Sequence, residues 1–224
     1  GLGDVYKRQG IYFVTEQLDT TRLHDKYGVT AFPLDYPNAW DRRNGRTGDG
    51  IWVHGVDPRG GARPPLDTDG CIALPNDRLL ALEPLFEANI TPVLIATEML
   101  LVEPGQVTRL RAGLEGAVMH WAADLEQGDM VAWLSAYDDA FQHWGMDKEE
   151  WSAFSMETVG QRPITKVDVS DLLLLADPQE EGLYLSRFRL EVSEGDAQTT
   201  ITWRRMYWRR SESGAFRIVA EDSG

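Results

Sequence analysis

The spacing of hydrophobic residues changes near residue 103, and this change most constrains what the chain can fold into. Before it, short apolar runs alternate with turn-rich stretches. The expected elements there are strands over 11–15, 51–54 and 93–96 and a helix over 76–88. Asn76 is the expected cap of that helix. We therefore expect a first domain over residues 10–101 that consists mainly of short strands and turns.

After residue 103 the sequence predicts helices followed by strands. The expected helices cover 107–127, 129–141 and 148–159, with Asp129 as the cap of the second. A period of two then predicts strands that contain residues 167–169, 184–188, 200–203 and 216–218. Helices followed by a run of antiparallel strands are typical of a separate α+β domain. We therefore expect a linker over 102–106 and a second domain over 107–224.

Composition and charge exclude several classes of protein. Lys and Arg number 22 against 36 Asp and Glu, so the net charge is −14 at pH 7. This charge argues against a general nucleic-acid binder, because phosphate affinity is built from clustered Lys and Arg. No apolar run approaches the ~20 residues that a membrane helix needs. Cys71 is the single cysteine, which excludes an internal disulfide framework and a cysteine-rich zinc module.

The strongest candidates for catalytic residues are Cys71 and His54. A thiol is a useful nucleophile only as thiolate, and a nearby imidazole can take its proton and later return it to a leaving amine. Seventeen residues separate the pair, so they can meet only across neighbouring strands or a folded loop. Gly55 and Gly70 lie directly beside them and allow close approach of the backbone to a substrate. The amides of Gly70 and Cys71 are candidates for an oxyanion hole.

Two plainer interpretations of these residues stay open at this point. A lone cysteine in a globular chain is more often a small buried hydrophobe, and a lone histidine beside apolar residues is more often a core group than a base. A zinc site built from His54, Cys71 and Asp69 is a third possibility, but the three residues lack the spacing of known zinc motifs.

The two segments together resemble the signature of the L,D-transpeptidase (YkuD) catalytic domain. In that family a His-Gly strand precedes a Ser/Thr-x-Gly-Cys-Ile/Val segment, and the matching residues here are 54–55 and 68–72. Residues 10–12 are similar to the end of the family's upstream motif, and residues 93–95 to its closing strand. Two positions depart from the pattern, because most members have His at Asp69 and Arg at Ala73.

The resemblance implies a partial β-sandwich and a cysteine acyltransferase that acts on peptidoglycan stem peptides. Cys71 would attack the carbonyl that links meso-diaminopimelate to the terminal D-Ala. His54 would act as base and then as acid, and the Gly70 and Cys71 amides would hold the oxyanion. Further candidates for substrate contact are Gly55, Thr68 and Asp69. The acceptor is left open between an amine of another stem peptide, a lysine of an envelope lipoprotein, and water. No metal and no organic cofactor are implied.

The second half resembles the NTF2-like fold, in which three helices pack in the concavity of a curved antiparallel sheet. The residues expected to line that cone are Trp121, Trp133, Tyr137 and Trp151, and the plain alternative is that they are core. The overall expectation is an α+β protein with a partial L,D-transpeptidase β-sandwich followed by an NTF2-like cone. By resemblance, we expect it in the periplasm of a Gram-negative envelope.

Two rival functions are compatible with the same residues. One is an amidase that hydrolyses peptidoglycan–lipoprotein links by the same Cys/His chemistry. The other is a non-catalytic module that binds the cell wall or a partner protein. Residues 1–9 show no hydrophobic period and resemble a translated sequencing-adapter stretch, so we expect them to be non-native and any signal peptide to lie further upstream.

Overall fold

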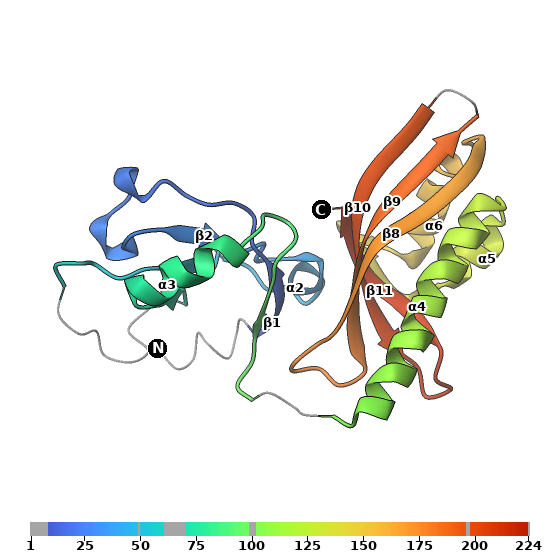
Figure 1. Cartoon of the computed structure of the whole chain (residues 1–224). Coiled ribbons are helices and arrows are strands. Elements are labelled where there is room, and N and C mark those ends of the chain that lie inside the picture. The colour runs from blue at the N-terminus through green and yellow to red at the C-terminus, as the bar shows by residue number, and fades with distance from the viewer. Residues whose placement is uncertain (1–8, 49, 61–69, 99–101, 196–197, 224) are drawn as a thin grey trace. The chain divides into compact units, whose positions relative to one another are not determined.

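The computed structural model describes residues 9–48, 50–60, 70–98, 102–195 and 198–223. The chain divides into two compact units, each with its own colour range in Figure 1. Unit 1 comprises residues 1–41 and 46–99, and unit 2 comprises residues 42–45 and 100–224. Most of the predicted adapter-like stretch, residues 1–8, lies outside the described residues.

Unit 1 is built from two small sheets. Strand β1 (Gly10–Phe13) pairs antiparallel with β5 (Pro92–Ile95). The other sheet has β3 (Trp52–His54) at its centre, antiparallel to β2 (Ala31–Pro33) and parallel to β4 (Ile72–Ala73). The three strands predicted from the sequence correspond to β1, β3 and β5, whereas β2 and β4 were not predicted.

The helices of unit 1 are short. They are α2 (Ala39–Arg43) and α3 (Asn76–Leu82), together with single 3-10 turns η1 (Thr20–Arg22), η2 (Asp25–Tyr27) and η3 (Glu83–Leu85). The predicted helix over 76–88 begins as expected but ends at Leu82. Pro84 follows within η3, and a proline lacks the N–H that would continue the α-helical ladder. The prediction that Asn76 caps this helix is wrong, because Pro75 is the cap and no side chain bonds to the helix there.

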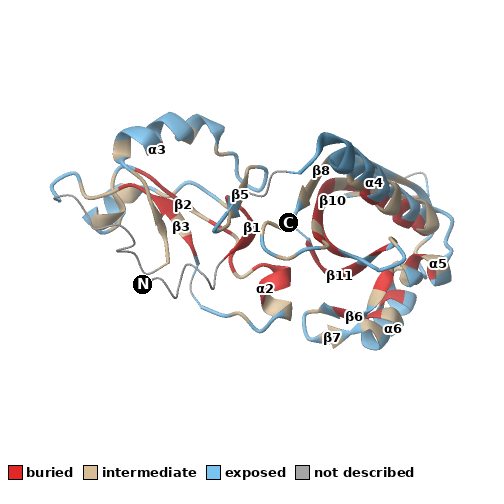
Figure 2. Cartoon of the chain, turned by 90° about the horizontal axis from the view of Figure 1, so that it is seen from below, coloured by how far each residue is buried: buried red, intermediate tan, exposed pale blue. Residues whose placement is uncertain are grey.

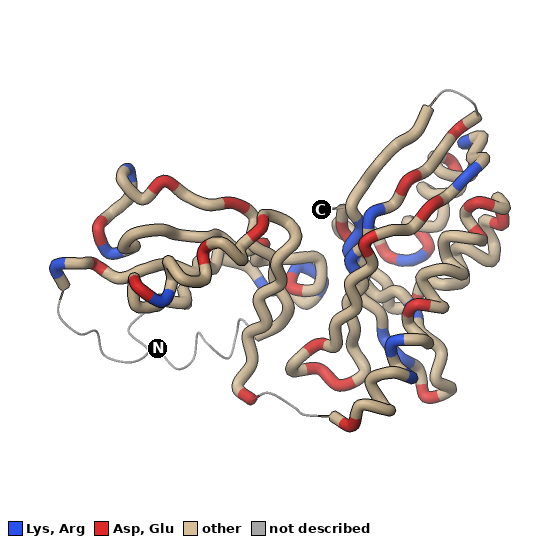
Figure 3. Tube along the Cα trace, viewed as in Figure 1, with Lys and Arg blue, Asp and Glu red and all other residues tan. Residues whose placement is uncertain are grey.

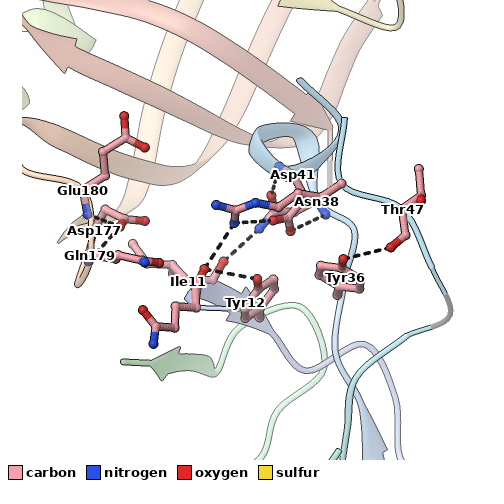
Figure 4. A network of polar contacts seen from close by, with 11 residues as sticks. Ile11, Tyr12, Tyr36, Asn38, Asp41, Thr47, Asp177, Gln179 and Glu180 are labelled. Carbon is pink, nitrogen blue, oxygen red and sulfur yellow. Dashed lines mark hydrogen bonds and ion pairs between the residues drawn. The ribbon is translucent and has the colours of Figure 1, made fainter. Parts of the chain in front are cut away.

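The core of unit 1 is apolar and is closed at one end by a buried polar network. The core side chains are Tyr12, Val14, Phe32, Leu34, Tyr36, Ile51, Val53 and Leu79. Beside them Asp41, which is 1% exposed, accepts hydrogen bonds from the Asn38 backbone at 3.2 Å and from Arg46 at 3.1 Å. Asn38 in turn donates to the Ile11 carbonyl at 3.0 Å (Figure 4). Burial raises the pKa of the Asp41 carboxyl, and the Asn38 and Arg46 contacts oppose that rise.

The helices of unit 2 are α4 (Pro104–Glu126), α5 (Met130–Ser135) and α6 (Lys148–Thr158), of which α6 follows the first two strands. Helix α4 starts inside the predicted linker, because a proline in the first turn removes only an N–H that has no partner within the helix. Asp129 caps α5 as predicted, with its carboxylate 2.9 Å from the Ala132 amide. Asp147 and Glu150 form a reciprocal capping box at the start of α6.

The strands of unit 2 form one six-stranded sheet in the order β7-β6-β11-β10-β9-β8. Their bounds are β6 Tyr137–His143, β7 Met146–Asp147, β8 Ile164–Ala176, β9 Leu183–Glu194, β10 Gln198–Arg210 and β11 Phe216–Ser223. The prediction of a helix over 129–141 is wrong beyond Ser135, because Tyr137 and Phe141 lie on β6. A spacing of four keeps two side chains on one face of a strand as well as of a helix, and parallel pairing with β11 selects the strand.

Helices α4, α5 and α6 lie on one face of this sheet, which is curved and buries its inner residues (Figures 1 and 2). The four predicted aromatic residues all lie in the core of unit 2: Trp121, Trp133, Tyr137 and Trp151. Their rings contact one another, with Trp121 and Trp133 centroids 5.7 Å apart and Trp133 and Tyr137 centroids 5.3 Å apart. The molecule is therefore an α+β protein whose second unit packs helices on a curved, mainly antiparallel sheet.

Candidate active site

Strand β3 positions His54. Side chains alternate along a strand, and Val53 packs into the core of unit 1 with 3% of its surface exposed. Its neighbours Trp52 and His54 therefore point to the opposite face of the sheet. His54 is itself only 4% exposed, so its imidazole is held among other groups and not in open solvent.

Cys71 directly precedes β4, and the pairing of this strand with β3 predicts which face Cys71 lies on. In the parallel β3–β4 pair, Val53 is the partner of Ile72 and His54 is the partner of Ala73. Paired residues on adjacent strands share a face, and continuing the alternation by one residue places Cys71 on the face of Ala73. This register predicts that the half-buried Cys71 and the buried His54 are diagonal neighbours on one face of the sheet. Ala73, where most members of the resembled family have Arg, lies directly beside His54.

A backbone carbonyl orients the His54 ring. The Nδ1 atom of His54 lies 2.6 Å from the carbonyl oxygen of Gly55. A carbonyl oxygen only accepts hydrogen bonds, so Nδ1 carries the proton of the neutral ring and the lone pair lies on Nε2. This tautomer is the one that can take a proton from a thiol on the Nε2 side.

An aromatic side chain that sequence analysis missed packs against this face. The ring of Tyr27, at the end of η2, lies 5.2 Å from the His54 ring and 4.8 Å from the Trp52 ring between centroids. An ion pair between Asp25 and Arg59 connects the same turn to the loop after β3. Nothing in the sequence around Tyr27 pointed to His54, because the contact depends on the pairing of β2 with β3.

Asn76 is a second residue whose role the sequence did not reveal. Its Oδ1 accepts a hydrogen bond from the Val56 amide, and its Nδ2 donates to the Val56 carbonyl, both at 2.9 Å. A Cβ atom on Gly55 would lie 2.2 Å from this Oδ1, and one on Gly28 would lie 2.6 Å from it. Position 55 thus requires glycine because the Asn76 side chain occupies the space, whereas at Gly28, whose φ is +70°, the Val56 backbone nitrogen is nearer still at 2.5 Å. Gly55, predicted as a substrate contact, is in the structure a contact of Asn76.

The residues before Cys71 are only partly described. Gly70 has a φ of +99°, a backbone conformation that favours glycine, and it leads directly into Cys71. The other two candidates for substrate contact, Thr68 and Asp69, lie outside the described residues. Among the described residues, no group of three or more His, Cys, Asp or Glu side chains could hold a metal ion.

A separate hollow of about 340 Å³ lies on unit 2, between the first turns of α4 and the β10–β11 hairpin. Its lining residues are Gln106, Arg109, Leu110, Gly113, Arg210, Gly214 and Phe216. Basic and acidic residues are both found along this unit (Figure 3), and several arginines form ion pairs, such as Arg205 with Asp222 at 3.0 Å. Within the described part of the chain, Arg109 and Arg210 form no ion pair. The hollow therefore offers two guanidinium groups beside an apolar wall.

The helices of the described residues include none with the length and apolar character needed to span a membrane. Among curated proteins, none matches the sequence at a significant level. Residues 3–95 match the family described as the L,D-transpeptidase catalytic domain, YkuD. This match confirms the resemblance seen in the His-Gly and Gly-Cys segments.

Solved structures share the fold over nearly the whole chain. Bd1075 of Bdellovibrio bacteriovorus is 24% identical, with a TM-score of 0.75 over 98% of this chain and 80% of that one. The helical cell shape determining protein Pgp2 of Campylobacter jejuni is also 24% identical, with a TM-score of 0.78 over 98% of this chain and 76% of that one. An NTF2-like protein of Pseudomonas putida covers 52% of this chain at 16% identity, with a TM-score of 0.45 over 87% of its own length.

Proposed function

Because residues 3–95 match the L,D-transpeptidase catalytic domain, we propose that unit 1 is a cysteine acyltransferase acting on peptidoglycan stem peptides. The observation that supports the proposal is the parallel pairing of β3 with β4, which predicts Cys71 on the face of His54, whose Nδ1 is bonded to the Gly55 carbonyl. This arrangement supplies a thiol with a base whose tautomer is set. The match supports the family, and the residue roles are our proposal.

The proposed reaction proceeds in two halves. Nε2 of His54 takes the proton of the Cys71 thiol, and the thiolate attacks the carbonyl between meso-diaminopimelate and the terminal D-Ala. The amides of Gly70 and Cys71 donate to the resulting oxyanion. When the C–N bond breaks, His54 returns the proton to the departing amine of D-Ala, and a thioester remains on Cys71. In the second half an acceptor attacks the thioester, His54 takes the acceptor's proton, and the thiol is restored.

The acceptor separates the transferase from its nearest rival. Attack by an amine of another stem peptide or of a lipoprotein lysine gives transpeptidation, whereas attack by water gives hydrolysis. An amidase that cuts peptidoglycan–lipoprotein links would use the same two residues. We take transfer to an amine as the proposal, and product analysis with and without added amine distinguishes the two reactions.

Release of D-Ala from a soluble stem tetrapeptide by the full chain tests the function. We expect Cys71→Ser to reduce release to background and His54→Ala to reduce it by about 10²–10⁴-fold, the usual contribution of general acid–base catalysis. His120→Ala, on the exposed side of α4, is the matched control and should leave the rate unchanged. A folded wild-type chain that releases no D-Ala and forms no covalent adduct with a carbapenem would refute the proposal.

The hollow on unit 2 favours a second candidate function, a module that binds cell-wall peptide. Its two guanidinium groups suit the carboxylates of a stem peptide, and Leu110 and Phe216 suit the methyl groups of Ala. We expect Arg109→Gln and Arg210→Gln each to weaken binding of a stem tripeptide about tenfold, while Arg111→Gln on the same helix does not. Equal affinities for all variants would reject this role for the hollow.

We place the protein in the bacterial envelope, with the periplasm as the proposed compartment. Support comes from the peptidoglycan chemistry of the matched family and from the cell-shape function in the name of Campylobacter jejuni Pgp2. The proposed partners are peptidoglycan stem peptides, and an envelope lipoprotein is the second candidate acceptor.

A further inference from the structure

We propose that Asn76 is a positioning residue for His54, acting through the single peptide group that joins Gly55 to Val56. The carbonyl of this peptide group accepts the Nδ1 proton of His54 at 2.6 Å. The N–H of the same group donates to Oδ1 of Asn76 at 2.9 Å. One planar unit is therefore bonded to the imidazole at one end and to the Asn76 side chain at the other.

The planarity of the peptide bond makes this connection effective. Rotating the Gly55–Val56 peptide to move its carbonyl away from His54 would also move its N–H away from Asn76. The second bond of Asn76, from Nδ2 to the Val56 carbonyl at 2.9 Å, opposes the same rotation from the next peptide group. Glycine at 55 would otherwise let this backbone rotate freely, because it lacks a side chain.

The same short segment holds the thiol. Asn76 lies five residues after Cys71, and between them the Leu74 amide donates to the His54 carbonyl at 2.9 Å. Three hydrogen bonds thus connect the segment that carries Cys71 with residues 54–56 of the strand that carries the imidazole. Asn76 therefore holds the imidazole in a fixed relation to the segment of the nucleophile as well as fixing the tautomer of the ring.

The glycines at 28 and 55 show that the fold reserves room for this side chain. The space that a Cβ would take is filled at Gly55 by Oδ1 of Asn76, and at Gly28 by this atom together with the backbone of Gly55 and Val56. Gly28 also ends the turn of Tyr27, whose ring packs on His54. The Asn76 side chain, which follows the Cys71 segment, therefore contacts both the turn that ends at Gly28 and the residues directly after His54.

The tautomer of His54 in the ¹⁵N-labelled full chain tests the inference directly. Imidazole ¹⁵N chemical shifts report which ring nitrogen carries the proton. We expect the Nδ1–H tautomer in the wild type and in Asn76→Asp, which keeps an acceptor for the Val56 N–H. We expect a mixture of tautomers in Asn76→Leu, which has a similar size but no hydrogen-bonding group. Asp77→Ala, an exposed change one residue further along α3, is the matched control and should match the wild type.

Alkylation of Cys71 by iodoacetamide as a function of pH provides the second readout. We expect Cys71 in the Asn76→Leu variant to be alkylated about tenfold more slowly near neutral pH than in the wild type. Loss of a hydrogen bond that supports a functional histidine typically lowers activity by about 10–100-fold at other sites. A purely structural role would lower the melting temperature without changing the tautomer. The inference is overturned if Asn76→Leu keeps the wild-type tautomer, or if the wild type itself shows Nε2–H, a result that needs no variant to fold.

This inference rests on the proposed function, but the two can fail separately. A wild type that releases no D-Ala refutes the acyltransferase, while a change of tautomer in Asn76→Leu still shows that Asn76 positions the ring. A wild type that releases D-Ala, with an Asn76→Leu variant that does so at the same rate and with the same tautomer, refutes the positioning role alone.

Discussion

The two units of this protein reach a folded state by different means. The strands of unit 1 have at most 4 residues, and β4 has only 2, whereas β8 and β10 of unit 2 have 13 each. Short strands supply few backbone hydrogen bonds, and unit 1 compensates with side chains such as the buried Asn38 and the half-buried Asn76 that bond to the backbone. Unit 2 relies on one large aromatic core.

The difference corresponds to the roles that we propose for the two units. A site that must hold a thiol, an imidazole and a backbone carbonyl in fixed relation benefits from hydrogen bonds, which are directional. Apolar packing is not directional, and in unit 2 it supplies the stable core that carries the surface hollow. The comparison predicts that unit 1 will be sensitive to the loss of single polar side chains and unit 2 to the loss of large apolar ones.

The largest expected effect comes from separating the units. We predict that residues 102–224 alone will melt cooperatively, because about 120 residues with a complete core suffice for a domain. Residues 9–98 alone should be protease-sensitive, since short strands leave backbone groups without partners. Circular dichroism melts and limited proteolysis of both fragments measure this. An unfolded C-terminal fragment would show that the units depend on each other.

A smaller effect is expected from Trp121→Ala in the core of unit 2. Trp121 is 1% exposed and contacts the rings of Trp133 and Phe188. Its truncation should lower the free energy of unfolding of unit 2 by about 3–5 kcal/mol, the usual cost for a buried aromatic. Met119→Ala, on the exposed side of the same helix, is the control. Urea unfolding gives the value, and a loss below about 1 kcal/mol would contradict the importance of this core.

Asn38→Ala should destabilise unit 1 by about 2 kcal/mol, because it removes the partner of the buried Ile11 carbonyl and of the Asp41 amide. The matched control is Asn89→Gly, since Asn89 is exposed and has a φ of +59°, a conformation that glycine adopts without strain. Loss of protection in hydrogen exchange should be confined to unit 1. Equal loss of hydrogen-exchange protection in both units would contradict the prediction that unit 1 alone depends on this polar side chain.

The smallest effect concerns pH and the buried Glu221 of unit 2. Burial raises the pKa of Glu221 above 4.5, against the opposing charge of Arg204 and the hydrogen bond from Tyr137. Between 4.5 and the raised pKa the folded state binds more protons than the unfolded chain, so stability falls as pH rises through that window. Glu221→Gln should remove this slope, and Glu212→Gln in the exposed hairpin turn should keep it. Urea unfolding at a series of pH values measures both.

The two units also differ in how well sequence patterns predicted them. In unit 2 the long helix, the Asp129 cap and the four later strands follow from periodicity over many residues. The error at Tyr137 and Phe141 arose because a spacing of four fits both a helix and a strand. In unit 1, the two-residue β4 is too short to carry a period, and β2 ends in a proline, whereas the equally short β3 was predicted from its apolar run. The candidate pair His54 and Cys71 was found from residue type and resemblance, whereas Tyr27 and the Asn76 amide were not.

The sequence by itself determined the features that neighbouring residues encode: the start of α3, the cap at Asp129, and the two segments that carry a thiol and an imidazole. Only the tertiary structure decided which side chains meet. The pairing of β3 with β4 predicts Cys71 on the face of His54, and the Asn76 side chain bonds to the Val56 backbone instead of capping α3. The reason is physical. Helix and turn signals depend on the conformational preferences of adjacent residues, whereas strand register and buried hydrogen bonds are selected by contacts between residues far apart in the chain.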